Sequence, residues 1–198
     1  DMIFGQRGAD TIQGDGSVRD ENGLLRTTVS IEAATDGDDY IEGGGEGDVI
    51  FGNLGQDDII GGNSSQFGLS LKSQRGADNE FGVDDSDMIY GGSGEDIARN
   101  NVGDVGDDGH ARDSDMILGD NGNIFRIVGT NKTDTGALLN FVYDDYGSAG
   151  TERIVVRAAE LIDYTPGGLD YNETDALTDI GAGDEIHGES GDDFIYGM

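Results

Sequence analysis

The chain has 198 residues, of which 36 are glycine and none is cysteine or tryptophan, and its formal net charge is −31. This charge excludes the basic surface that nucleic acids need and opposes contact with anionic membranes, while the lack of cysteine excludes disulfides and thiolate metal sites. Hydrophobic residues make up 34% of the chain, so we expect a thin core that needs another source of stability. Disorder is one interpretation of such a composition, and bound cations that neutralise the folded form are the other.

A nine-residue unit recurs along the whole chain. Written as G-G-x-G-x-D-x-U-x, with U a large aliphatic residue, it runs unbroken through ATDGDDYIE, GGGEGDVIF and GNLGQDDII at residues 34–60. In chain order the copies, several of them loose, lie at residues 5–13, 34–42, 43–51, 52–60, 73–81, 82–90, 91–99, 110–118, 179–187 and 188–196. Because the chain also begins and ends within a unit, we expect it to be a piece of a longer protein.

The unit predicts a six-residue turn followed by a three-residue strand. Glycine allows the positive φ angles and close backbone contacts of a tight turn, and x-U-x places one side chain inward and two outward. If two units close one coil, the strands stack into two parallel sheets, and each coil needs its neighbours to bury its aliphatic residue. The predicted inward ladder consists of Ile3, Ile12, Ile41, Ile50, Ile59, Ile89, Ile117, Ile186 and Ile195.

Four segments interrupt the repeat, at residues 14–33, 61–72, 100–109 and 123–178. The last contains apolar runs rich in β-branched and aromatic residues, NIFRIVG, GALLNFVY and TERIVVRAAELIDY, which predict strands. We therefore expect an all-β fold. It would be a parallel β-roll, or β-solenoid, over residues 1–122 and 179–198, with a β-rich insertion at 123–178 packed on it.

The outward position after each inward isoleucine is often apolar. Its apolar occupants are Phe4, Phe51, Ile60, Phe81, Tyr90, Leu118 and Tyr196. Scattered surface residues of this kind need no explanation, but we favour a cover because large exposed apolar patches are uncommon. Tyr90 and Leu118 lie in repeats two units apart, so they share a sheet if the 100–109 insertion does not change the parity of the coil. We expect residues 123–178 to fold back over that sheet. A segment that projects free would instead be a partner-binding arm.

The aspartate at position six of the unit admits two interpretations. An isolated aspartate in a turn usually caps backbone N–H groups. Asp48 and Asp57, however, lie in consecutive units with the same inward isoleucine, and carboxylates stacked at the strand spacing of about 4.8 Å would repel each other without a counterion. Ca²⁺ takes about six to eight oxygen ligands, so it suits carboxylates and backbone carbonyls together. We therefore predict that these aspartates are metal ligands.

With these copies in register, the sequence resembles the RTX (repeats-in-toxin) family, whose hemolysin-type nonapeptide repeat binds calcium. The resemblance implies a β-roll that holds several Ca²⁺ ions between its turns. It also implies a secreted bacterial protein that stays unfolded in low cytosolic calcium, leaves the cell by type I secretion and folds outside it.

The family pattern implies calcium ligands from two turns that lie one coil apart. The clearest implied site combines Thr35, Gly37 and Asp39 with Gly52, Leu54 and Asp57. A second implied site combines Gln74, Gly76 and Asp78 with Gly91, Ser93 and Asp96. Further implied ligands, whose partner turns are interrupted or absent, are Gly8, Asp10, Gly44, Glu46, Asp48, Gly61, Asn63, Asp85, Asp87, Asp115, Asp184, Gly191 and Asp193. Glu46 and Ala182 replace the glycine expected at position four of their turns.

No catalytic motif stands out in the sequence. His110 and His187 lie apart, each in or beside a repeat, and HExxH, GxSxG and P-loop patterns are absent. Self-cleaving RTX segments cut at Asp-Pro, but the single proline, Pro166, follows Thr165. We therefore expect that the chain is not an enzyme.

Two classes of function follow from the repeat. The first is a calcium-binding module of a large secreted adhesin or toxin, outside the cell or at its surface, whose parent protein recognises a cell-surface or host ligand. The alternative is the non-catalytic C-terminal RTX region of a secreted protease, lipase or alginate epimerase. An ice-binding face would need regular outward threonines, which the repeats lack. The negative charge makes us expect no nucleic-acid binding. We also expect no membrane insertion, since a membrane span needs about 18 consecutive apolar residues and no stretch is that long.

Overall fold

The computed structural model describes residues 1–15, 30–66, 85–95, 111–129, 137–139, 153–162 and 181–197. The strands in this part of the chain are β1 (Met2–Arg7), β2 (Thr11–Gln13), β3 (Tyr40–Gly45), β4 (Val49–Phe51), β5 (Asp58–Ile60), β6 (Met88–Tyr90), β7 (Met116–Leu118), β8 (Gly122–Arg126), β9 (Arg157–Leu161), β10 (Glu185–His187) and β11 (Phe194–Tyr196). The described residues form no helix that could cross a membrane.

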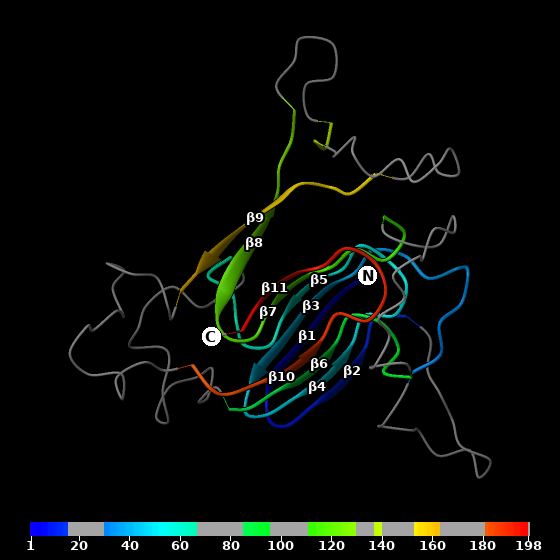
Figure 1. The fold of residues 1–198 in the computed structure, drawn as a ribbon. Helices are drawn as coiled ribbons and strands as arrows, with labels where there is room; N and C mark the ends of the chain where they lie inside the picture. Colours follow the sequence, from blue (N-terminus) through cyan, green and yellow to red (C-terminus); the bar gives the residue numbers. More distant parts are fainter. Residues whose placement is uncertain are drawn as a thin grey trace.

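Nine of the strands form two parallel sheets that face each other (Figure 1). The first sheet has the order β1-β3-β5-β7-β11, and the second has the order β10-β6-β4-β2. From β1 to β7 the chain alternates between the two sheets, and it does so again from β10 to β11. Two strands and two turns therefore make one coil, and the predicted parallel β-roll is confirmed.

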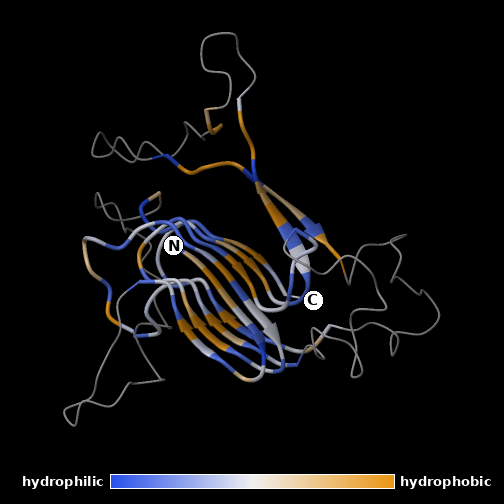
Figure 2. Ribbon diagram, turned by 180° about the vertical axis from the view of Figure 1, so that it is seen from behind, coloured by the Kyte–Doolittle hydropathy of each residue, from blue (hydrophilic) through white to orange (hydrophobic). Residues whose placement is uncertain are grey.

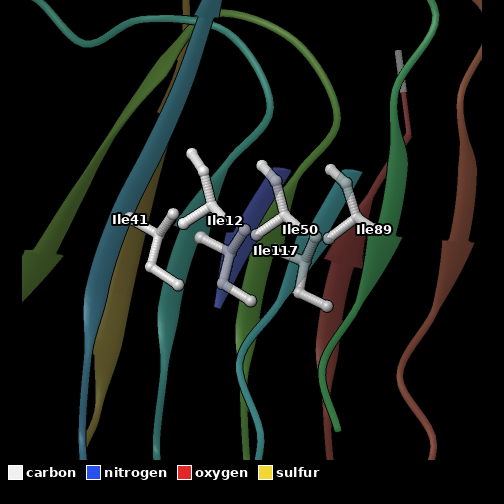
Figure 3. Packing of buried hydrophobic residues seen from close by; sticks show 6 residues of the cluster. Ile12, Ile41, Ile50, Ile89 and Ile117 are labelled. Atoms are coloured by element: carbon white, nitrogen blue, oxygen red, sulfur yellow. The ribbon is translucent and has the colours of Figure 1, made fainter. Parts of the chain in front are cut away.

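The inward isoleucines set the register of both sheets. In the first sheet Ile41 pairs with Ile59 and Ile59 with Ile117, and in the second Ile12 pairs with Ile50 and Ile50 with Ile89. These side chains stack between the sheets (Figure 3) and form one buried cluster, with Ile3 and Ile186 packed against it. Figure 2 shows the result as hydrophobic bands along the strands and hydrophilic turns at both edges. A three-residue strand thus contributes one core side chain, which it can bury only within a stack.

The turns take their shape from residues with positive φ angles at positions two and four of the unit. Gly44 and Gly191 adopt φ values of 119° and 98°, which cost glycine nothing. Gln6, Asn53 and Glu189 adopt the same left-handed region at position two. Glu46 takes φ 74° where the sequence replaces glycine at position four, so this turn keeps its conformation at the expense of backbone strain.

The insertions lie within turns, and the flanking strands still pair in register. Residues 61–87 separate β5 from β6, yet Ile89 pairs with Ile50. Residues 119–184 separate β7 from β10, yet Ile186 pairs with Ile89. Interrupting the chain at a turn therefore leaves the stack of coils intact.

The expectation that Tyr90 and Leu118 share a sheet is wrong. Tyr90 ends β6 in the second sheet, whereas Leu118 ends β7 in the first. The repeat-like letters at 91–99 suggest an intervening strand, but β7 follows β6 directly in the order of described strands. The described strands therefore alternate from β6 in the second sheet to β7 in the first, which differs from the alternation that was counted from the sequence.

The described part of the long insertion contains β8 and β9, which form an antiparallel ribbon. We call residues 122–129, 137–139 and 153–162 the arm. Its base packs on the outer face of the first sheet, where Ile124 joins a buried cluster with Ile60, Met116 and Leu118. Beyond this base residues 127–129 and 137–139 lead away from the roll (Figure 1), whereas Val155 is hydrogen-bonded to Gln56 of the roll. The described base of the insertion therefore covers the first sheet at Leu118, whereas Tyr90 lies on the second sheet.

The other outward apolar residues differ in their burial. Phe51 is fully buried, and Tyr90 stacks between Phe51 and His187 on the second sheet, with ring centroids 5.0 Å and 5.2 Å apart. Tyr196 on β11 is 42% exposed. The predicted cover therefore fails at the last strand of the first sheet, while Phe81 lies outside the described residues.

Candidate metal sites

The position-six aspartates stack into two columns, one along each edge of the roll. The first Asp ladder consists of Asp10, Asp48, Asp87 and Asp184, which precede the strands of the second sheet. The second Asp ladder consists of Asp1, Asp39, Asp57, Asp115 and Asp193, which precede the strands of the first sheet. Each ladder aspartate after Asp1 is therefore the last residue of its turn, directly before the strand.

A repeated hydrogen bond joins successive members of each ladder. The backbone N–H of one aspartate donates to Oδ1 of the aspartate on the next coil, over 2.7 Å from Asp39 to Asp57 and 2.9 Å from Asp57 to Asp115. The same bond runs from Asp10 to Asp48, from Asp48 to Asp87, from Asp87 to Asp184 and from Asp115 to Asp193. The ammonium of Asp1 donates to Asp39 in the same way. These bonds orient the carboxylates of the seven acceptors, which are Asp39, Asp48, Asp57, Asp87, Asp115, Asp184 and Asp193.

The second carboxylate oxygen has no such partner. Oδ2 is buried without a hydrogen-bond donor in Asp10, Asp39, Asp48, Asp57, Asp87, Asp115 and Asp184. Burying an acceptor without a partner costs about 1–3 kcal/mol, and more for a charged group. Seven repetitions of one unsatisfied atom, all at the same position of the unit, indicate that something outside the protein satisfies it.

Each orphaned oxygen faces the glycine that opens its own turn. A Cβ atom on Gly52 would lie 2.4 Å from Asp57 Oδ2 and 2.3 Å from the carbonyl oxygen of Gly91, one coil further on. A Cβ on Gly43 would likewise meet Asp48 Oδ2 at 2.5 Å and the Gly61 carbonyl at 2.3 Å. Glycine is therefore required at position one, because these two oxygens occupy the space of a side chain.

The pairing of a carboxylate with a carbonyl fits a hard cation. Neither oxygen can donate a hydrogen bond to the other while the carboxylate is ionised. Both are ligands that Ca²⁺ prefers. Among the described residues no three His, Cys, Asp or Glu side chains converge on one point, so a cation there must draw on backbone carbonyls as well as carboxylates.

Burial also changes how readily these carboxyl groups ionise. Burial is the main cause that raises the pKa of Asp48 to about 7 and that of Asp87 to about 8; neighbouring aspartates add to it, and the backbone hydrogen bond that each carboxylate accepts opposes it. Burial raises the pKa of Asp57 and Asp115 well above the ordinary carboxyl value, again with neighbouring aspartates adding to the effect. The raised pKa values mean that protons compete with a cation for the carboxylates of Asp48, Asp57, Asp87 and Asp115.

The structure brings together part of the clearest predicted site. Asp39 and Asp57 are hydrogen-bonded neighbours, and the Gly52 carbonyl and Asp39 Oδ2 lie 2.8 Å and 2.1 Å from a Cβ placed on Gly14. The Gly37 carbonyl faces Gly55 instead. Thr35 is exposed and Leu54 is half-buried in their turns. The full ligand set therefore stays a prediction.

The second predicted site lies mostly outside the described residues, because these include none of Gln74, Gly76, Asp78 and Asp96. Its remaining members are placed differently from the prediction. A Cβ atom on Gly91 would lie 2.2 Å from Asp115 Oδ2. The Ser93 carbonyl accepts a hydrogen bond from the Ser30 N–H. On the next coil, Asp87 follows Asp48 in the first Asp ladder and Asp115 follows Asp57 in the second.

The remaining predicted residues have varied positions. Asp85 is exposed, and its carboxylate accepts the Ser86 N–H, so the structure does not bring it into either ladder. Asn63 bonds Asn121 and Gly122 at the base of the arm. Gly8, Gly44, Glu46 and Gly191 supply positive φ angles to their turns.

Five position-one glycines were missed from the sequence, and two of them, Gly5 and Gly14, lie against the Oδ2 atoms of Asp10 and Asp39. The other three, Gly43, Gly119 and Gly188, each lie against the Oδ2 atom of a ladder aspartate. The carbonyls of these three also face the position-one glycine of the preceding coil. Each follows directly after an x-U-x strand. That spacing is the signal that could have identified them.

Comparison with known families agrees with this geometry. The model of the RTX calcium-binding nonapeptide repeat matches four copies, at residues 1–17, 34–64 and 181–198. Repeats of this family bind calcium ions. The matched segments hold seven of the nine ladder aspartates, and the exceptions are Asp87 and Asp115. Searches of curated proteins and of solved structures found no match.

Proposed function

We propose that this chain, which carries the calcium-binding nonapeptide repeats of the RTX family, is a calcium-dependent folding module of a large secreted adhesin or toxin. The observation that carries the proposal is the column of buried Oδ2 atoms without donors. RTX repeats are typical of secreted proteins and support the coarser statement, a calcium-binding module. The finer assignment, to an adhesin or toxin, is compatible with the absence of catalytic motifs from the sequence.

The sites lie between successive coils along both ladders. Each uses ladder carboxylates together with carbonyl oxygens of the turns that they join. Calcium supplies positive charge to bridge these acceptors. Asp87 and Asp115 belong to these calcium sites as well. Each accepts the same N–H to Oδ1 hydrogen bond from the preceding ladder aspartate as the residues inside the family match do. This extends the sites across the insertions.

Calcium control of folding follows from the charge of the chain. A net charge of −31 opposes compaction, and the core is a single ladder of isoleucines. Binding energy that requires the assembled turns is therefore folding energy. A chain that is unfolded in low calcium could be exported by type I secretion and fold outside the cell.

We further propose that residues 1–122 and 179–198 form one roll that residues 123–178 interrupt. The register of β10 against β6 and of β11 against β7 supports a single continuous stack. The same module would also serve as the non-catalytic C-terminal region of a secreted protease, lipase or epimerase. In that case the catalytic residues lie elsewhere in the parent protein.

Circular dichroism in chelator and in millimolar Ca²⁺ tests this function. We expect a largely disordered spectrum in chelator and a β spectrum with Ca²⁺. Mg²⁺ should substitute poorly, because it demands a small octahedral shell and dehydrates reluctantly. A spectrum that does not change on chelation would contradict the proposal.

A further inference from the structure

Two arginines of the arm enclose a single aspartate of the roll. Arg126 on β8 places Nε 2.6 Å from Asp58 Oδ2, and Arg157 on β9 places Nε 2.8 Å from Asp58 Oδ1. The Asp58 side chain is 6% exposed and that of Arg157 is 1% exposed. Each carboxylate oxygen thus has its own guanidinium, in a buried cluster with little freedom to move.

The same arginines reach the neighbouring coils. Arg126 Nη1 lies 3.0 Å from Asp38 Oδ2, and its Nη2 donates to the Gln56 carbonyl. Arg157 Nη1 donates to the Ser114 carbonyl over 2.8 Å. These bonds span three successive coils.

The Gln56 side chain continues this contact into the arm. Its Nε2 donates to the Arg153 carbonyl, and its Oε1 accepts the Val155 N–H over 2.8 Å. The roll therefore holds the backbone of the arm as well as its arginines.

The contacted residues all lie directly beside members of the second Asp ladder. Asp38 directly precedes Asp39, Gln56 and Asp58 flank Asp57, and Ser114 directly precedes Asp115. The arm thus holds the residue before each of three consecutive members of the second Asp ladder, and at Asp57 it also holds the residue after it. Asp10 and Asp48, by contrast, lie on the opposite edge of the roll.

Calcium needs its oxygens at about 2.3–2.6 Å, so small shifts of these turns change the fit. Groups that orient ligands commonly change metal affinity by about 10–100-fold. The charge of the arginines acts in the other direction, because a cation near the ladder opposes Ca²⁺. Positioning and charge therefore predict opposite effects when an arginine is removed.

We propose that Arg126 and Arg157 are positioning residues for calcium at the second Asp ladder. They lock the turns that carry Asp39, Asp57 and Asp115, so docking of the arm and calcium binding favour each other. This inference rests on the proposed calcium sites.

Hydrogen exchange of the whole chain during a calcium titration tests the inference. The Asp39 and Asp57 amides report the second ladder, and the Asp10 and Asp48 amides report the first. In Arg157→Gln we expect the calcium midpoint for protection of the second ladder to rise about tenfold, with the first ladder unchanged. Arg7→Gln, an exposed site on β1, removes the same charge and should leave both midpoints unchanged.

Arg157→Lys separates geometry from charge. Lysine keeps the charge but cannot form the forked contact with Asp58 and Ser114, so its second-ladder midpoint should rise as in Arg157→Gln. A wild-type midpoint in the lysine variant, or an equal shift or loss of protection at both ladders in either variant, would overturn the inference. Absence of calcium protection at both ladders of the natural chain would instead contradict the proposed function.

Discussion

At the scale of the residue, the position-six aspartate divides its two oxygens between two tasks. In Asp57 one oxygen accepts the Asp39 N–H and ties two coils together. The other is buried without a donor and faces the Gly91 carbonyl across the empty side-chain position of Gly52. The first oxygen sets the register, and the second creates the demand for a cation.

Asp57→Asn should separate these two tasks. Asparagine keeps an oxygen for the Asp39 N–H, and its amide can donate to the Gly91 carbonyl, but it removes the charge. We expect calcium affinity to fall by about tenfold or more, while β structure in chelator increases. Calorimetric titration and circular dichroism measure the two effects.

The matched control is Asp85→Asn, which removes the same charge from an exposed residue outside the ladders. It should leave both calcium affinity and calcium-free structure near those of the natural chain. Equal losses in the two variants would mean that total charge matters and the ladder position does not.

At the scale of the element, the turn depends on the left-handed conformation more than on glycine itself. Glu46 adopts φ 74° at position four, where most L-residues are strained by about 1–2 kcal/mol. Glu46→Gly should therefore stabilise the calcium-loaded roll by about 1 kcal/mol. Thermal unfolding in saturating Ca²⁺ measures this change.

The control for charge is Glu46→Gln, which removes the carboxylate but keeps the strain. It should leave the unfolding temperature well below that of Glu46→Gly. If the two variants were equally stable, relief of repulsion with Asp48 rather than backbone strain would be the cause.

For unbroken repeats the sequence predicts which strands share a sheet, but for interrupted repeats it does not predict which copies join the stack. The nine-residue spacing correctly predicted that Ile41, Ile50 and Ile59 alternate between two sheets. It could not show that Asp87 and Asp115 occupy the next ladder places, because Asp78 and Asp96 carry the same local pattern. Which copy joins the stack depends on how an insertion closes, and tertiary packing decides that.

The β structure of the arm was predictable from the sequence, but the contacts of its arginines with the roll were not. Its β-branched runs predicted strands, and in the described part β8 and β9 are such strands, with Ile124 packed against Leu118. The roles of Arg126 and Arg157 depend on residues that lie up to 99 positions away in the chain. No local spacing reports such a contact.

At the scale of the whole molecule, the ladders make calcium-free stability depend on pH. The folded pKa values of about 7 for Asp48 and about 8 for Asp87 and Asp193 lie above the ordinary value of 3.8. Their contribution to stability is therefore fully present below about pH 4 and is lost as the pH rises through 7 to 8.

We accordingly expect β structure in chelator to increase as the pH falls from 9 to 5. Calcium affinity should fall over the same range, because protons and Ca²⁺ compete for the same oxygens. Circular dichroism in about 0.5 M salt, which screens general repulsion between exposed charges, isolates the ladder. Calcium-free β structure that increases with pH would contradict this account.

The central claim is that calcium occupies the gaps where a ladder Oδ2 faces a carbonyl of the next coil. Anomalous diffraction from crystals of the calcium-loaded chain tests it most directly. The account predicts peaks along both edges, including peaks beside Asp87 and Asp115, with each Oδ2 within about 2.3–2.6 Å of an ion. An ordered roll without peaks along the ladders, in which protein donors satisfy the Oδ2 atoms, would contradict it.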